Sequence, residues 1–174
     1  ADYATYHVST QEFEAWNQGW QYRNDGVDIE FSSDENGNGY HIGFVQEGEW
    51  LLHTVNIENS GFYDLVTRYA ADSNGKIKIE VNGYPISDEI MLYDSGSWND
   101  FYSKLTEGVY LNEGLAKLKT NILSDGFNLS SFEFSETQTI PNFSIENAYT
   151  NDNSEIYLLL NHPINDQQIL NSYF

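Results

Sequence analysis

The chain contains no cysteine, and only 7 of its 174 residues are lysine or arginine. The absence of cysteine excludes disulfide bonds, cysteine-ligated zinc and cysteine nucleophiles. The few basic residues stand against 27 aspartates and glutamates, which gives a formal net charge of −20. A chain with this charge repels nucleic-acid phosphates and anionic membrane surfaces, so we expect neither as a partner. No apolar run approaches the roughly 20 residues that are needed to span a bilayer.

The chain is rich in acidic and aromatic residues. The acidic surplus suits a soluble extracellular protein and hard cations such as calcium. No signal peptide is visible, and the start at Ala1 is typical of a trimmed or mature chain. With 4 tryptophans, 13 tyrosines and 10 phenylalanines, the chain has enough apolar surface for a core. Its length fits one full domain and part of a second.

Short segments with alternating apolar and polar residues recur along the first three quarters of the chain, and clusters of turn residues separate them. The five clearest segments are residues 49–57, 62–70, 76–81, 115–123 and 129–134. The third is followed by Asn82-Gly83, a strong hairpin signal. Without a convincing amphipathic helix between them, these strands predict an all-β fold, an antiparallel β-sandwich.

The composition of the sequence changes near Ser135, where the alternating pattern gives way to a polar segment that ends at Pro141. We therefore assign residues 1–135 to the sandwich and 136–142 to a linker. Residues 143–174 contain two more strand-like segments, 143–148 and 155–160. This region is either an extension that folds back on the sandwich or the truncated start of an immunoglobulin-like module, and we favour the second.

Four short motifs follow one another between about residues 10 and 135. They are residues 11–16, 40–50, 95–98 and 126–129. In this order they resemble family 6 carbohydrate-binding modules, with their opening acidic strand, Gly-aromatic step, Gly-Gly-Trp and aromatic-Asn-Leu motifs. Residues 21–23 and 26–30 further resemble modules attached to marine-polysaccharide hydrolases, including β-agarases. The resemblance implies a jelly-roll, lectin-like sandwich with a ligand site in loops at one end.

In that family a sugar ring lies between two aromatic side chains, and an asparagine hydrogen-bonds its hydroxyls. The matching positions are Phe44 and Trp98 for the rings and Asn128 for the amide. A flat ring covers the apolar C–H face of a pyranose, and an amide both donates to and accepts from hydroxyls. Trp98 stands in a loop of serine, glycine and aspartate, where a core tryptophan is less natural. Phe44 replaces the more common tyrosine, which removes a hydroxyl but keeps the ring.

Three further residues are candidates for the same site. Glu30 falls near a ligand-contacting acid of some family members, while Phe127 forms either the floor of the site or core packing. Tyr40 is a rim residue or a packing residue. In some relatives the aromatic that matches Trp50 serves a second cleft on the concave face. The sequence leaves both roles of Trp50 open, a residue of such a cleft or an ordinary sheet residue.

A calcium site is expected at the opening strand. Glu12 and Glu14 are two residues apart on a strand, so their carboxylates leave the same face and repel unless a cation bridges them. The family binds calcium at these positions, with further ligands expected from Asn38 in the loop 34–38 and from Ser130. Ser130 departs from the family pattern, and the alternative is a solvated edge strand.

The resulting hypothesis is a secreted, monomeric and non-catalytic module that targets an attached glycoside hydrolase to polysaccharide. Agarose or another marine galactan is the preferred ligand, with β-1,3-glucan or xylan as the alternative. A small β-sandwich glycanase or lyase is the competing enzymatic reading, because acidic residues are plentiful. A structural or adhesive sandwich is the third. No nucleophile elbow, phosphate loop or metalloprotease motif is present in the sequence.

Overall fold

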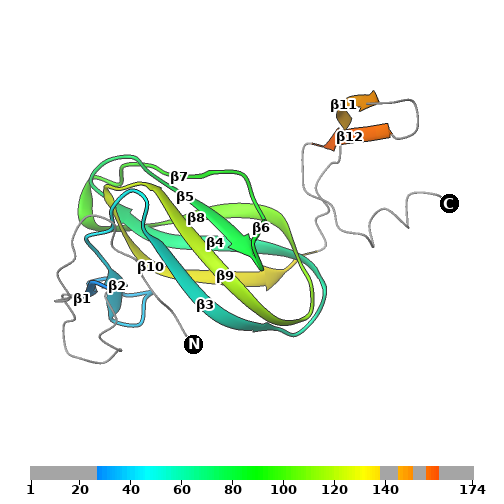
Figure 1. The fold of residues 1–174 in the computed structure, drawn as a ribbon. Helices are drawn as coiled ribbons and strands as arrows, with labels where there is room; N and C mark the ends of the chain where they lie inside the picture. The colour runs from blue at the N-terminus through cyan, green and yellow to red at the C-terminus, as the bar shows by residue number, and fades with distance from the viewer. Residues whose placement is uncertain (1–26, 138–144, 151–155, 161–174) are drawn as a thin grey trace.

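The structure, a computed structural model, describes residues 27–137, 145–150 and 156–160. Every regular element in these ranges is a β-strand (Figure 1). The strands are β1 (Ile29–Phe31), β2 (Tyr40–Ile42), β3 (Trp50–Ile57), β4 (Gly61–Ala71), β5 (Gly75–Val81), β6 (Tyr84–Pro85), β7 (Ile90–Leu92), β8 (Ser97–Leu111), β9 (Gly114–Ser124), β10 (Phe127–Glu136), β11 (Ile145–Thr150) and β12 (Ile156–Leu160). The described part contains no helix of the length and hydropathy that crossing a membrane requires.

Two antiparallel sheets form the sandwich. One has the strand order β1-β2-β10-β4-β8, and the other has the order β3-β9-β5-β6, with β7 paired to β5. The predicted all-β sandwich is therefore confirmed. The turn at Asn82-Gly83 has φ of 53° and 85°, the two left-handed residues that a type I′ hairpin requires, and it joins β5 to β6.

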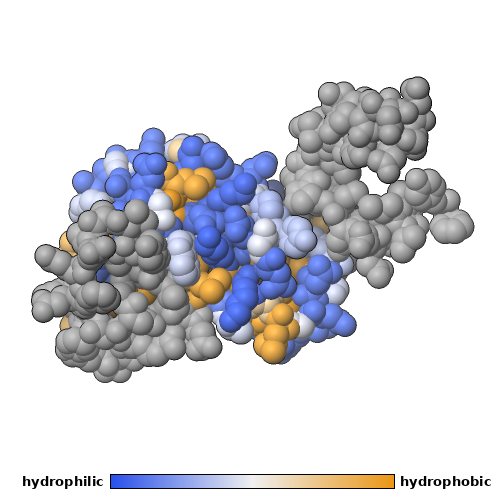
Figure 2. All heavy atoms as spheres, viewed as in Figure 1, coloured by the Kyte–Doolittle hydropathy of each residue, from blue (hydrophilic) through white to orange (hydrophobic). Residues whose placement is uncertain are grey.

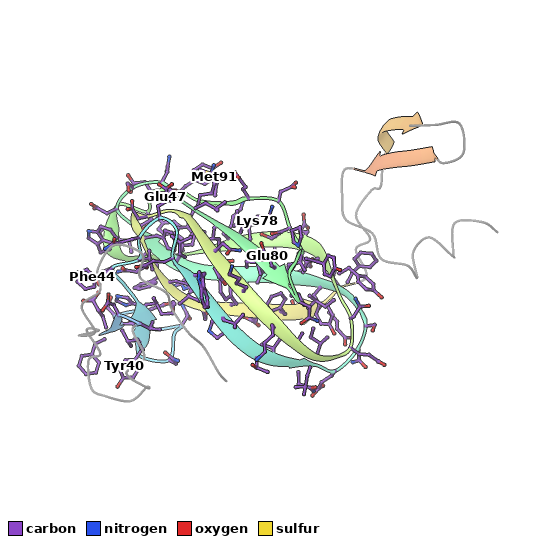
Figure 3. All side chains as sticks on the ribbon, viewed as in Figure 1. Tyr40, Phe44, Glu47, Lys78, Glu80 and Met91 are labelled. Atoms are coloured by element: carbon purple, nitrogen blue, oxygen red, sulfur yellow. The ribbon has the colours of Figure 1, made fainter. Side chains whose placement is uncertain are left out.

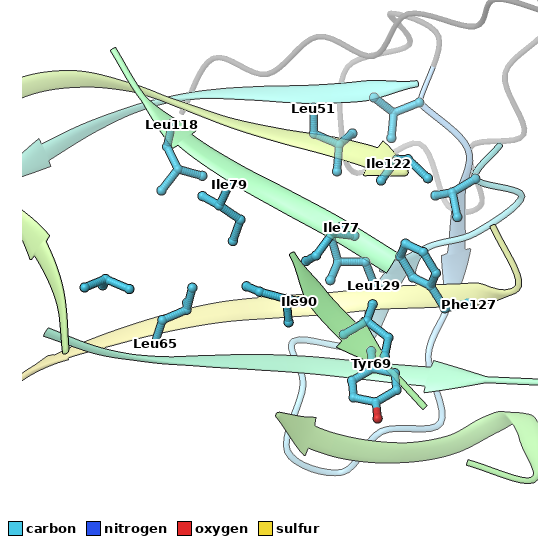
Figure 4. Packing of buried hydrophobic residues seen from close by; sticks show 14 of the residues in the cluster. Leu51, Leu65, Tyr69, Ile77, Ile79, Ile90, Leu118, Ile122, Phe127 and Leu129 are labelled. Carbon is cyan, nitrogen blue, oxygen red and sulfur yellow. The ribbon is translucent and has the colours of Figure 1, made fainter. Parts of the chain in front are cut away.

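The core lies between the sheets and is built from alternate side chains of each strand (Figure 4). Ile77 and Ile79 of β5 and Leu118 of β9 enter it from one sheet. Leu65 of β4 and Phe127 of β10 enter it from the other. Because strand side chains alternate, the neighbours of these residues point outward and remain free to form surfaces.

The longest strand, β8, was not predicted from the sequence. Its fifteen residues are mostly exposed or half-buried, and only Val109 and Leu111 are buried. It lies at the edge of its sheet, so it lacks the regular apolar alternation by which the other long strands were recognised. Its first residues build one wall of the site described below.

Beyond the sandwich, β11 pairs with β12 in a hairpin of its own. This hairpin coincides with the two strand-like segments expected in residues 143–174. The last backbone hydrogen bond of the sandwich runs from Thr137 N to Phe62 O. The assignment of 136–142 as a linker and of 143–174 as an extension or immunoglobulin-like start stays a prediction.

Candidate functional site

A cleft of about 360 Å³ opens at the end of the sandwich that carries Phe44 (Figure 3). Its walls come from β1, β2, the turn after β2, and the beginnings of β8 and β10. The lining residues are Glu30, Phe31, His41, Phe44, Val45, Trp98, Asn99, Phe127 and Asn128. Five of the six candidate sugar-binding residues thus come together here. The sixth, Tyr40, packs against the wall, with its ring centroid 5.4 Å from that of Phe31.

The two candidate stacking rings are both open to solvent. Phe44 is 61% exposed and Trp98 is 44% exposed. Phe44 also has a φ of 52°, an uncommon conformation for a residue other than glycine, asparagine or aspartate. Such a conformation costs of order 1–3 kcal/mol and persists where the surroundings impose it. The preceding residue is fixed by the hydrogen bond from Gly43 N to Asp28 O, 3.1 Å.

Trp98 reaches the cleft because β8 bulges away from β4. Ser97 pairs with Ala71 and Phe101 pairs with Ala70, so residues 98–100 are extra residues on the β8 side. The loop before them is held by hydrogen bonds: Ser95 Oγ accepts from Ala71 N at 2.8 Å, and Asp94 Oδ1 accepts from Gly96 N at 2.8 Å. The small polar residues that marked this loop in the sequence therefore fix the backbone that carries the indole.

Asn128 joins the two walls of the cleft. It is buried, and its Nδ2 donates to the backbone oxygen of Trp98 at 2.9 Å. Its Oδ1 faces Gly43, where an added Cβ would lie 3.3 Å away. The same Cβ would lie 2.6 Å from Oε2 of Glu30. Glycine at position 43 therefore makes the room in which these two oxygens sit.

The Glu30 carboxylate is oriented by a contact with His41 of β2. His41 is buried, and its Nε2 lies 3.3 Å from Glu30 Oε2. Burial lowers the pKa of His41, although the hydrogen bond and charge of Glu30 oppose this shift. The imidazole is therefore neutral at neutral pH and donates its Nε2 proton to the carboxylate. Phe101 packs against the ring, 5.6 Å between centroids.

Phe127 forms the base of the cleft. Its side chain is fully buried and also belongs to the core, so both uses foreseen for it, site floor and packing, apply together. It packs directly on Gly75 of β5, which has no side chain to obstruct the ring. The floor is therefore fixed by the contact between the two sheets.

The loop expected to bind calcium contains an ion pair. Asp34, whose side chain is 1% exposed, accepts from Arg68 Nη2 at 2.7 Å and from Arg68 Nε at 2.9 Å. The hydrogen bond from Arg68 is the main reason that the pKa of Asp34 lies below its usual value. Ser130 Oγ lies 3.3 Å from Asp34 Oδ2, and Asn38 Oδ1 accepts from Tyr40 N at 3.1 Å.

The other two expected calcium ligands, Glu12 and Glu14, lie outside the described residues. Residues 27–137 contain no group of three acidic, histidine or cysteine side chains arranged to hold a metal ion. Asn38 in this loop and Ser130 on β10 are the two expected ligands that the structure describes, and both offer neutral oxygens. Calcium prefers such mixed oxygen ligands.

The sequence model of the family described as "Carbohydrate binding module (family 6)" matches residues 18–136. A module from Cellvibrio mixtus lichenase 5A, solved with cellotriose, is 26% identical with a TM-score of 0.58, and the match covers 65% of this chain and 88% of that chain. No curated protein sequence matches the chain significantly.

Two further solved structures share the fold. The C-terminal family 6 module of a marine laminarinase from Zobellia galactanivorans is 20% identical with a TM-score of 0.58, covering 63% of this chain and 88% of that one. A β-1,3-glucan-binding module from Bacillus halodurans is 22% identical with a TM-score of 0.55, covering 63% and 85%.

Proposed function

The chain belongs to the family 6 carbohydrate-binding modules, which bind carbohydrate and do not catalyse its cleavage, and from this premise we propose that its loop cleft binds a neutral polysaccharide through one stacked sugar ring. The observation that carries the proposal is the meeting of two exposed rings, Phe44 and Trp98, with a fixed carboxylate and amide in one cleft. The preferred ligand is agarose or another marine galactan.

The cleft offers a pyranose both of the contacts that it needs. Stacking on an exposed ring removes apolar sugar surface from water, at roughly 25 cal/mol per Å² buried. Glu30 can only accept hydrogen bonds, and His41 already holds it in place, so a sugar hydroxyl meets a preorganised acceptor. One or two sugars bury little area, so we expect a dissociation constant on the order of 10–1000 µM, improved by avidity when several sites act together.

The composition of the cleft favours binding over hydrolysis. Glycoside hydrolysis normally requires two carboxyl groups that flank the scissile bond. Among the described residues that line the cleft, Glu30 is the only carboxylic acid. We therefore propose that a separate, attached glycoside hydrolase performs any cleavage and that this secreted module holds it on its substrate.

A second candidate ligand is supported by the comparisons. The Cellvibrio mixtus module was solved with cellotriose, and the Bacillus halodurans module is described as binding β-1,3-glucan. A β-glucan presents the same pairing of an apolar ring face with peripheral hydroxyls. β-1,3-Glucan therefore stands beside agarose as the alternative ligand of the same cleft, with xylan after it.

Affinity electrophoresis in gels that contain agarose, β-1,3-glucan or xylan tests the cleft and ranks these ligands. We expect retardation by at least one polymer, and we expect Trp98→Ala and Phe44→Ala to abolish it. Tyr84→Ala is the matched control, because Tyr84 is an exposed aromatic (76%) on β6 that does not line the cleft. No retardation by any polymer would refute the proposal, and so would equal retardation of Trp98→Ala and wild type.

We also propose that calcium stabilises the module through Glu12 and Glu14, with Asn38 and Ser130 as oxygen ligands. A cation bound only to the folded state raises the melting temperature by mass action. Removal of calcium with a chelator should lower the melting temperature by several degrees, and Glu12→Gln/Glu14→Gln should melt at that lower temperature with or without calcium. An unchanged melting temperature after chelation would count against this site.

A further inference from the structure

Two side chains of the sheet β1-β2-β10-β4-β8 point away from the core and are nevertheless buried. Ala70 of β4 and His41 of β2 each lie between two residues that belong to the core or pack against it. Because strand side chains alternate, both therefore face outward, yet Ala70 is 0% exposed and His41 is 4% exposed. The outer face of the other sheet is hydrophilic over β5 and β9, as expected for solvated side chains (Figure 2). The first sheet thus has a covering of its own near the cleft.

Phe101 is part of this covering. It lies on β8 and pairs with Ala70 of β4, which in turn pairs with Asn128 of β10. Because the side chain of Ala70 is only a methyl group, the Phe101 ring can extend across the sheet toward β2. Its centroid lies 5.6 Å from that of His41, the residue whose Nε2 lies 3.3 Å from Glu30 Oε2. Phe101 therefore supports the imidazole that orients the carboxylate.

The Phe101 ring is in turn in contact with a fixed cation. The central carbon of the Arg68 guanidinium lies 6.0 Å from the ring centroid. Two hydrogen bonds to Asp34 hold this guanidinium, and its Nη1 also donates to Ser103 Oγ at 3.3 Å. A guanidinium held in its plane by three hydrogen bonds is already oriented for contact with an aromatic ring. The contacts thus continue from the ion pair through Phe101 to the cleft.

We propose that Arg68 and Phe101 are positioning residues of the cleft, which act on a bound sugar through His41 and Glu30. The guanidinium holds the Phe101 ring against His41, and His41 holds the carboxylate where a sugar hydroxyl meets it. Neither Arg68 nor Phe101 lines the cleft, so neither contacts the sugar itself. Phe101 also ends the bulge that presents Trp98, so its placement affects both walls. This inference rests on the proposed function of the cleft.

A positioning role can be distinguished from a purely structural one. A residue that only stabilises the fold leaves the affinity of the folded molecules unchanged when it is replaced. A positioning residue lowers that affinity, because the acceptor in the cleft is no longer preorganised. Burial is the main cause that lowers the pKa of His41, so removal of the Phe101 ring should also raise this pKa by admitting water.

Two measurements on Phe101→Leu and Arg68→Gln test the proposal below their melting temperatures. Calorimetry with the neutral polymer that retards the wild type most gives the affinity, and NMR titration without polymer gives the pKa of His41, assigned with His41→Gln. We expect both variants to bind about two- to fivefold more weakly, the effect of one lost aromatic or cation–π contact. We also expect the pKa of His41 to rise, most of all in Phe101→Leu.

The chain offers a matched control for each substitution. Phe134→Leu makes the same change on β10 at a partly buried residue that does not line the cleft. Lys104→Gln removes one positive charge from β8, also away from the cleft. Arg68→Lys keeps the charge beside Asp34 and serves if Arg68→Gln does not fold. Because lysine lacks the planar fork, it should still weaken binding.

The outcomes separate the alternatives. Wild-type affinity in both Phe101→Leu and Arg68→Lys would overturn the proposal, and so would equal losses in the two controls. Weaker binding with an unchanged pKa of His41 would overturn the route through His41. If the wild type binds no polymer, the proposed function of the cleft fails, while the titration of His41 still decides whether Phe101 and Arg68 hold the imidazole.

Discussion

The side-chain amide of Asn128, at the start of β10, donates a hydrogen bond to the backbone oxygen of Trp98 at 2.9 Å. This contact joins strands of one sheet that are separated by β4, and it fixes the loop that presents the indole. In the proposed site the amide therefore has a positioning role in addition to any contact with sugar. Its other polar atom, Oδ1, lies beside Gly43, where an added Cβ would be 3.3 Å away.

The first prediction concerns this hydrogen bond. Asn128→Ala removes the donor and leaves the Trp98 carbonyl without it, which should lower the free energy of unfolding by about 1–3 kcal/mol. Asn128→Asp keeps the size of the side chain but cannot donate when ionised. Both variants should bind polysaccharide more weakly in isothermal titration calorimetry. Wild-type affinity in both would show that the Asn128 bond does not position Trp98.

The second prediction concerns the space above Gly43. A Cβ there would lie 2.6 Å from Glu30 Oε2, so Gly43→Ala must displace the carboxylate from its place beside His41. We expect about a tenfold loss of affinity, the effect of roughly 1.4 kcal/mol from one misplaced polar group. Gly61→Ala is the control, because a Cβ at Gly61 meets nothing within 4 Å. Equal affinities of the two variants would contradict a role for the Glu30 position.

The sequence alone could predict much of the scaffold and the most characteristic side chains of the site. Alternation located β3, β4, β5, β9 and β10 to within a few residues. Trp98 and Asn128 were found through family motifs, and the structure places both in one cleft. The contacts of these two residues with sugar stay predictions.

Other parts of the site carry no local signal. His41 looked like any scattered histidine, because its role comes from a carboxylate eleven residues away and from burial by Phe101 of another strand. The left-handed conformation of Phe44 could not be predicted from its residue type, because glycine is the residue that usually adopts it.

The third prediction concerns pH. Burial lowers the pKa of His41 and of His53 in the folded state, so both prefer to be neutral there. As the pH falls below about 6.5, the unfolded chain takes up protons that the folded chain resists, and folding stability decreases. Chemical denaturation between pH 7.5 and pH 5 should show this decrease. His41→Gln should make it shallower, and an unchanged slope would contradict the contribution of His41.

The last prediction concerns the ion pair between Asp34 and Arg68. The Asp34 side chain is 1% exposed and that of Arg68 is 18% exposed, and two hydrogen bonds join them. Removal of one partner from a buried pair strands the other charge and costs about 3–5 kcal/mol, whereas loss of both is milder. Arg68→Ala should therefore be less stable than Asp34→Ala/Arg68→Ala, although the double variant has lost more contacts. Denaturant titration of the two variants gives the comparison, with m-values checked for equality. If the double variant is the less stable one, the pair contributes mainly through its own attraction and hydrogen bonds, and the stranded Asp34 carboxylate is not the main cost.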